Sequence, residues 1–231
     1  MSFYQRLMRD SENARQSFQS IPIIKQTIDS GITPELYAKY LEQAYHHVRF
    51  TVPLLELSLA KCGPNDANYA NALKEYIKEE TGHEEWILND IRALGFDSEA
   101  VRNGQGGFAC RMMVAYAHFV IEHVSPYAFL GMVHVLEGMS VALAQQAATS
   151  IATSLASAFG GSPPNAFSYL TSHGALDTEH VKFFEDLVNS LNDPVIEKII
   201  VDAANDFYRL FGNMFIELGE VAAKTYAAKA S

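Results

Sequence analysis

Three segments of the sequence carry histidine and carboxylate side chains at spacings that could hold a metal ion. In the first, residues 79–86 (EETGHEEW), Glu80 and His83 stand three positions apart, so on a helix both side chains project from one face. This ExxH spacing brings an oxygen and a nitrogen ligand to one ion in carboxylate-bridged metal proteins. Glutamates are common on exposed helix faces, so the pair taken alone is better explained as a solvated surface.

The second segment, residues 173–180 (HGALDTEH), places His173, Asp177 and His180 at positions i, i+4 and i+7. On a helix these positions form one continuous stripe. Two neutral imidazoles and a carboxylate are a recurring set of iron ligands in oxygen-activating proteins, and they leave coordination positions open. The alternative is a helix N-terminus that carries two surface histidines.

The third segment contributes a single carboxylate, Glu137, within the stretch SPYAFLGMVHVLEGMSVAL, where nearly every neighbour is apolar or small. A helix with this composition is buried on most sides, so it would also bury the carboxylate. A buried carboxylate stays ionised beside a metal ion or a His or Arg partner, and otherwise takes up a proton. His134 shares this face one turn earlier, either as such a partner or as a core histidine.

Helices are predicted to position these residues, because long stretches rich in Ala, Leu, Glu, Met and Lys run between the prolines. Thr33, Ser125 and Asp193 each precede a proline, which is typical of a helix N-terminus. Pro53 falls inside a helical stretch and predicts a kink, whereas the glycine-rich residues 95–108 are expected to be a loop. The helices are expected near residues 2–18, 34–61, 66–93, 109–124, 127–158, 165–190 and 195–226.

Composition restricts the class of protein. The 231 residues are 48% hydrophobic and 19% charged, as in an ordinary globular domain, and we expect one domain over residues 1–231. The net charge of −10 makes nucleic acid an unfavourable partner. The first twenty residues lack the apolar core of a signal peptide or membrane span, and the two cysteines, Cys62 and Cys110, cannot form a disulfide scaffold. These features predict a cytoplasmic protein without a membrane partner.

The six candidate metal ligands together supply three nitrogens and three carboxylates, which suits two ions better than one. They are Glu80, His83, Glu137, His173, Asp177 and His180. A ferritin-like site would repeat ExxH on two helices. No second ExxH occurs at a comparable place in this sequence, so the ligand pattern differs from that of ferritin.

In order and spacing the six residues resemble the metal motif of the haem-oxygenase-like di-metal oxidases, a family that includes CADD-like proteins and 1-alkene-forming fatty-acid decarboxylases. That motif has one Glu and one His on a first helix, a lone Glu on a second and HxxxDxxH on a third, and all its positions are filled here. The resemblance spans most of the chain. It implies an all-α, single-domain, seven-helix haem-oxygenase-like bundle.

The same resemblance implies two iron ions, as Fe/Fe or Fe/Mn, and O₂ as co-substrate. The substrate is expected to be a small organic molecule, carboxylate or amino-acid-like, and no catalytic residue is expected beyond the metal ligands. Because the family's chemistry is diverse, the shared metal site does not identify the substrate. Relatives commonly associate, so a homodimer is expected.

Two other activities of the same superfamily are alternatives. Thiaminase II is a non-redox hydrolase with a cysteine nucleophile on the helix equivalent to residues 127–158, and neither Cys62 nor Cys110 lies there. A TenA-like hydrolase or ligand-binding protein is nevertheless the second candidate. His46 and His47 could in principle offer an axial ligand to haem. A haem site would, however, give no role to the carboxylates of Glu80, Glu137 and Asp177.

Overall fold

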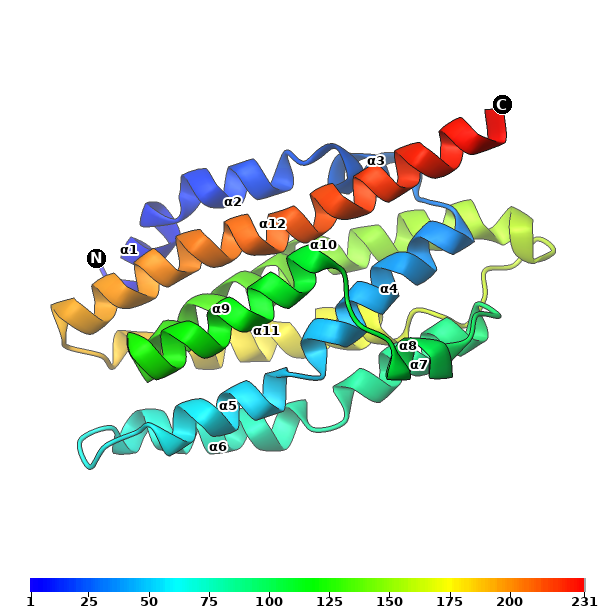
Figure 1. Cartoon of the computed structure of the whole chain (residues 1–231). Helices are drawn as coiled ribbons and strands as arrows, with labels where there is room; N and C mark the ends of the chain where they lie inside the picture. Colours follow the sequence, from blue (N-terminus) through cyan, green and yellow to red (C-terminus); the bar gives the residue numbers. More distant parts are fainter. Residues whose placement is uncertain (231) are drawn as a thin grey trace.

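The computed structural model describes the backbone of residues 1–230 and their side chains, except those of residues 173–178 and 225–230. Every regular element in this range is helical, so the all-α prediction is confirmed (Figure 1). In chain order the helices are α1 (Phe3–Asp10), α2 (Glu12–Gln19), α3 (Pro22–Ser30), α4 (Pro34–Val48), α5 (Thr51–Ala60), α6 (Ala67–Glu80), α7 (His83–Ala93), α8 (Ser98–Asn103), α9 (Phe108–His123), η1 (Pro126–Ala128), α10 (Phe129–Ala156), η2 (Ser157–Phe159), α11 (Ser168–Asn189) and α12 (Pro194–Ala230).

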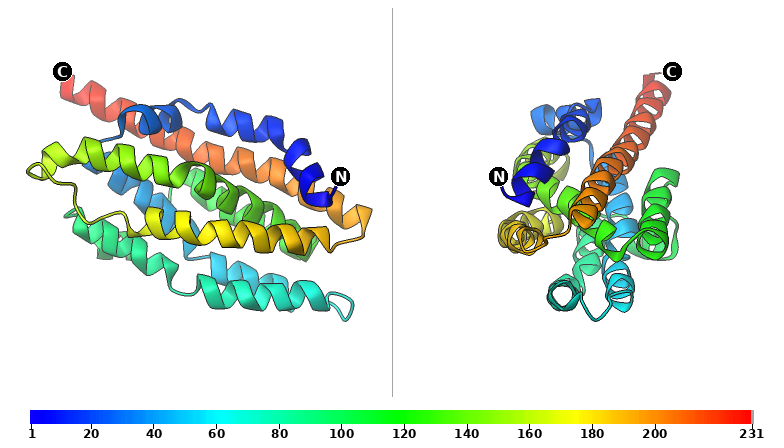
Figure 2. Two further views of the ribbon diagram at one scale, coloured as in Figure 1. Left: turned by 180° about the vertical axis from the view of Figure 1, so that it is seen from behind. Right: turned by 90° about the vertical axis from the view of Figure 1, so that its left-hand side faces the viewer.

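The centre of the bundle is α10, which packs against α3, α11 and α12. Helices α1 to α3 lie along one edge of the molecule and the α5–α6 pair along the opposite edge (Figures 1 and 2). By length and composition alone, residues 126–159 could cross a membrane, yet 56% of the most apolar window is buried inside the protein. Packing against three neighbouring helices therefore accounts for much of the apolar character of α10.

The expected number of seven helices is wrong, because three of the expected segments are interrupted. Residues 2–18 divide into α1 and α2 at Ser11, and residues 34–61 divide into α4 and α5 at Arg49 and Phe50. The kink expected at Pro53 is instead this break a few residues earlier. Pro53 lies in the first turn of α5, where the missing N–H has no intrahelical partner to lose. Helices α3 and α8 were not expected.

The three predicted proline-linked helix starts are confirmed. The Thr33 Oγ1 atom accepts a hydrogen bond from the backbone N–H of Leu36 at 3.3 Å, and Ser125 Oγ accepts one from Tyr127 at 3.2 Å. Asp193 Oδ1 accepts one from the Val195 N–H at 2.8 Å. Each side chain satisfies a backbone donor that the first helical turn leaves unpaired.

His134 is a core histidine. It is 4% exposed, its Nε2 atom lies 3.4 Å from Ser11 Oγ, and its ring stacks on Phe184 at 5.8 Å between centroids. Two tyrosine rings, of Tyr4 and Tyr208, meet it edge-on. Of the two sequence interpretations, these contacts favour packing over a partnership with the carboxylate one turn later.

Burial of His134 should make the protein less stable in mild acid. Burial lowers the pKa of His134 from 6.5 to about 4, so below pH 6.5 the unfolded chain binds a proton that the folded protein does not. The free energy of unfolding should therefore fall by about 3 kcal/mol between pH 6.5 and pH 4 from this group. Urea denaturation at both pH values measures the loss, and His134→Phe should remove most of it. An unchanged pH dependence in that variant would contradict this assignment.

Candidate metal centre

The ExxH pair is brought together by a break between two helices. Glu80 is the last residue of α6 and His83 the first of α7. Between them Gly82 has a φ of 93°, a left-handed conformation that glycine adopts without strain. The Nδ1 atom of His83 lies 3.1 Å from Glu80 Oε2, and both residues are buried. The two side chains therefore lie together, as the ExxH spacing predicts, but across a break between two helices and not on one continuous helix.

His180 on α11 joins this pair to α10. Its Nδ1 atom lies 3.6 Å from Glu80 Oε1 and 3.7 Å from Glu137 Oε1. One ligand atom from each of Glu80, Glu137 and His180 lies within 4.8 Å of the other two. His180 is 5% exposed and the Glu137 side chain 12%. Three helices thus place two carboxylates and one imidazole around one buried point.

The second nitrogen of His180 has a carboxylate partner of its own. Its Nε2 atom lies 3.1 Å from Glu79 Oε2. If Nε2 carries the proton and donates it to Glu79, the Nδ1 lone pair faces Glu80 and Glu137 and is available to a metal. Carboxylates in this position fix the tautomer and ring orientation of metal-binding histidines. Sequence reasoning missed Glu79, because a half-exposed glutamate on a helix carries no signal of its own.

The other three predicted ligands are His83, His173 and Asp177, and only the side chain of His83 is described. His83 contacts Glu80 but is not among the three residues whose ligand atoms converge; its ring stacks on Trp86 at 4.1 Å between centroids. His173 and Asp177 belong to α11, but their side chains lie outside the described residues. Three of the six predicted ligands therefore form the described cluster, and a fourth contacts it.

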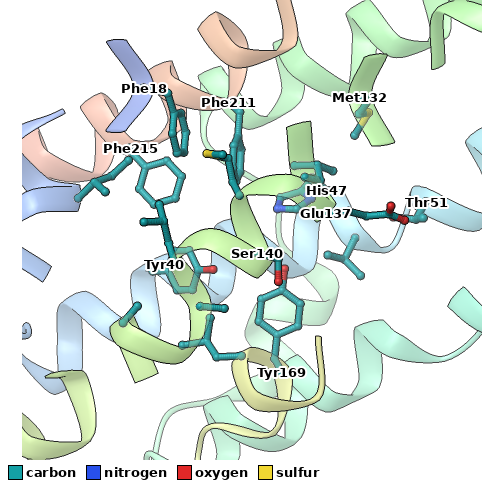
Figure 3. Close-up of a pocket in the computed structure, with 18 of the residues that line it drawn as sticks. Phe18, Tyr40, His47, Thr51, Met132, Glu137, Ser140, Tyr169, Phe211 and Phe215 are labelled. Carbon is teal, nitrogen blue, oxygen red and sulfur yellow. The ribbon is translucent and has the colours of Figure 1, made fainter. Parts of the chain in front are cut away.

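A mainly apolar cavity of about 170 Å³ adjoins the cluster. Glu80 and Glu137 form part of its wall, which is otherwise built by α2 to α6, α10, α11 and α12 (Figure 3). Its polar side chains, apart from these carboxylates, are Thr27, Tyr40, His47, Thr51, Tyr76, Ser140 and Tyr169. Such a cavity beside a polar cluster is the usual setting of a small-molecule site.

Tyr76 links the cavity to the cluster and was also missed in the sequence. It lies one turn before Glu80 on α6, is 2% exposed, and its ring meets that of His180 at 6.0 Å between centroids. Burial, followed by the charges of Glu137 and Glu80, raises the pKa of Tyr76 well above 10. The phenol is therefore protonated at neutral pH, and its hydroxyl has no hydrogen-bond partner among the described residues.

Neither cysteine is placed as a nucleophile. Burial raises the pKa of Cys110 to about 12, and its thiol donates to the backbone oxygen of Gln43 at 3.5 Å. Burial also raises the pKa of Cys62. Neither residue belongs to the cavity wall. A thiol is nucleophilic as the thiolate, so both cysteines are poorly suited to catalysis.

The described fold and cluster define an all-α bundle with a buried carboxylate and histidine site. A family model described as iron-containing redox enzyme matches residues 38–212. The chain belongs to this family, and the matched range includes Glu80, His83, Glu137 and His180. No curated protein matches the chain.

Solved structures show that the bundle has a haem-oxygenase-like fold. A domain of unknown function from Shewanella denitrificans with this fold is similar over 96% of this chain and 94% of its own, at 19% identity and a TM-score of 0.83. A TenA homologue from Pseudomonas syringae has 14% identity, coverage of 94% and 93%, and a TM-score of 0.76. A CADD-like protein of unknown function from Nostoc punctiforme has 17% identity, coverage of 94% and 99%, and a TM-score of 0.68.

Proposed function

We propose that the protein is a non-haem di-iron oxidase that uses O₂ to oxidise a small organic substrate. The observation that carries this proposal is the convergence of the Glu80 and Glu137 carboxylates on Nδ1 of His180, beside an apolar cavity. Carboxylate oxygens with imidazole nitrogens are the donor set of non-haem iron sites. Membership of an iron-containing redox enzyme family supports the same metal.

Two ions need more ligands than the described cluster supplies. We infer that Glu80, Glu137 and His180 hold the iron at the cavity, and that His83, His173 and Asp177 complete the set. The count of two, and the choice between Fe/Fe and Fe/Mn, rest on the number of donors and on the resemblance of the motif. Metal analysis of the purified protein distinguishes the two compositions.

The residues of this chain would have distinct roles around the iron. Glu79 orients His180 through the Nε2 contact, and the apolar walls exclude bulk water and orient the substrate. The Tyr76 hydroxyl is a donor at the junction of cluster and cavity. Bound iron supplies the redox chemistry by which O₂ is activated.

Anaerobic titration tests the proposal. Fe(II) is added to metal-free protein without oxygen, bound iron is counted after desalting, and absorption is followed when O₂ is admitted. We expect close to two irons per chain and an absorption change that depends on both iron and O₂. Failure to retain iron, or bound iron inert to O₂, would reject the oxidase.

The second candidate is a TenA-like hydrolase or ligand-binding protein. The TenA homologue among the similar structures favours it. Thiaminase-type hydrolysis needs a nucleophilic thiol, however, and the two cysteines are poorly suited to that role. The expected homodimer and cytoplasmic location stay predictions from the sequence.

The cysteines should be dispensable for the reaction. We expect Cys62→Ser and Cys110→Ser to retain both iron and the O₂-dependent absorption change, since no step needs a thiol. Iron content and the rate of the change are measured for each purified variant. If either substitution abolished turnover while iron stayed bound, the hydrolase would become the better candidate.

A further inference from the structure

The cavity joins a part that carries carboxylates to a part that is apolar and aromatic. In Figure 3, Glu137 and Thr51 lie on one side of it, and Phe18, Tyr40 and Phe215 lie on the other. Helix α10 lines the cavity over residues 129–151, and the arm of the cavity that runs from Glu137 to Ile151 also contains Ser140, Ala144 and Ala147 of this helix. Glu137 and Ala144 are seven residues apart, which is about 10 Å along a helix. A molecule seated in this arm would therefore have one end at the carboxylates and the other among apolar side chains.

The walls determine which charges such a molecule can carry. The cavity-lining residues of the described chain include no Lys, Arg or Asp, and the arm from Ser140 to Ile151 has no carboxylate among its α10 residues. An ammonium or carboxylate group at the aromatic end would lose its hydration without gaining an ion pair, at a cost of several kcal/mol. The amino-acid-like substrate expected from the sequence does not suit this wall if its charged groups must lie there.

Size and hydrogen bonding restrict the molecule further. An apolar protein cavity of about 150 Å³ binds benzene, so about 170 Å³ accepts a ring of that size or a short alkyl chain. At the cluster end, the Tyr76 hydroxyl is buried without a described hydrogen-bond partner. A buried donor left unpaired costs about 1–3 kcal/mol, and a polar head with an acceptor oxygen would remove that cost.

We propose that the cavity binds a substrate with an uncharged apolar body and a single oxygen-bearing head, which accepts a hydrogen bond from Tyr76 beside Glu80 and Glu137. The apolar body points along α10 toward Phe18 and Phe215. That the bound molecule is a substrate rests on the proposed function. Its binding in the cavity requires no metal.

Matched probes test the inference on metal-free protein. Calorimetry or ligand-detected NMR compares 1-hexanol with 6-hydroxyhexanoate, which has the same number of carbons but a carboxylate group at the far end. We expect 1-hexanol to bind and 6-hydroxyhexanoate to bind at least about 100-fold more weakly, because its carboxylate would be buried among apolar side chains or, with the chain reversed, beside Glu80 and Glu137. Equal affinities, or no binding of 1-hexanol, would overturn the proposal.

Variants at the two ends separate the head from the body. Tyr76→Phe should weaken 1-hexanol about three- to tenfold and leave benzene, which has no oxygen, unaffected. Ala144→Phe should abolish binding of both probes by filling the cavity. Ala142→Phe is the matched control, since Ala142 is exposed on the other face of α10. Unchanged binding in Ala144→Phe, with helicity and melting temperature like those of the control, would place the probes elsewhere.

The iron titration tests the oxidase and the probe experiment tests the cavity assignment, so each can be refuted without the other. A protein that binds 1-hexanol as expected but retains no iron would refute the oxidase and leave the cavity assignment intact. A protein that binds iron and reacts with O₂ but binds neither 1-hexanol nor benzene would refute only the cavity assignment.

Discussion

Replacing His180 with alanine is expected to lower the iron bound per chain from about two to one or less, because no other histidine among the described side chains belongs to the cluster with Glu80 and Glu137. Glu79→Gln keeps all the ligands but weakens the hold on the His180 ring, so it should cost about 10- to 100-fold in iron affinity. His180→Ala therefore lowers the number of irons bound, whereas Glu79→Gln lowers the affinity for iron.

Anaerobic Fe(II) titration with a competing chelator measures both variants. His123→Ala is the matched control, because the side chain of His123 is 63% exposed and contributes to neither cluster nor cavity. Iron content unchanged in His180→Ala would show that the described cluster is not an iron site. An affinity unchanged in Glu79→Gln would show that the Nε2 contact does not orient the ligand.

Glu137→Leu is expected to change stability and metal binding in opposite directions. In metal-free protein the carboxylate of Glu137 is nearly buried among apolar neighbours and close to a second buried carboxylate, that of Glu80. Leucine removes the desolvation cost of this carboxylate and its repulsion by Glu80, and it gives up the 3.7 Å contact with His180 Nδ1. Because the two costs outweigh the one contact, we expect metal-free Glu137→Leu to be about 1–2 kcal/mol more stable than the natural protein.

The same substitution removes a ligand, so Fe(II) should stabilise the variant much less than the natural protein. Urea denaturation with and without Fe(II), performed anaerobically, gives both quantities. Glu220→Leu on the exposed face of α12 should change neither by more than about 0.5 kcal/mol. A destabilised metal-free Glu137→Leu would instead show that the carboxylate stabilises the metal-free bundle.

Much of the fold could be predicted from local patterns. The starts of α4 and α12 follow from a capping side chain followed by proline, and the length and apolar character of α10 mark it as a central helix. The breaks could be predicted only in part. Pro53 predicts a disruption, because in a continuous helix its ring would clash with the carbonyl of Arg49, four residues earlier. Gly82 is a single glycine, which a helix tolerates at a cost of about 1 kcal/mol, so the break at that position could not be predicted from the residue alone.

The site could be predicted only where residue type and spacing coincide. Glu137 was identifiable because a lone carboxylate in an apolar helix needs a partner, and His180 because it belongs to a stripe. Glu79 and Tyr76 were not identifiable, because an exposed glutamate and a core tyrosine are ordinary on a helix. Their roles depend on how α6 packs against α11, which the pattern along α6 does not specify.

Glu80, Glu137 and His180 are proposed to bind iron beside the cavity. Anomalous diffraction at the iron absorption edge, from crystals grown anaerobically with Fe(II), would locate this iron. We expect an iron peak bonded to both carboxylates and to Nδ1 of His180, with Nε2 still in contact with Glu79. Iron located elsewhere, or a cluster that stays empty of iron in crystals containing excess Fe(II), would show that these three residues are not the iron site.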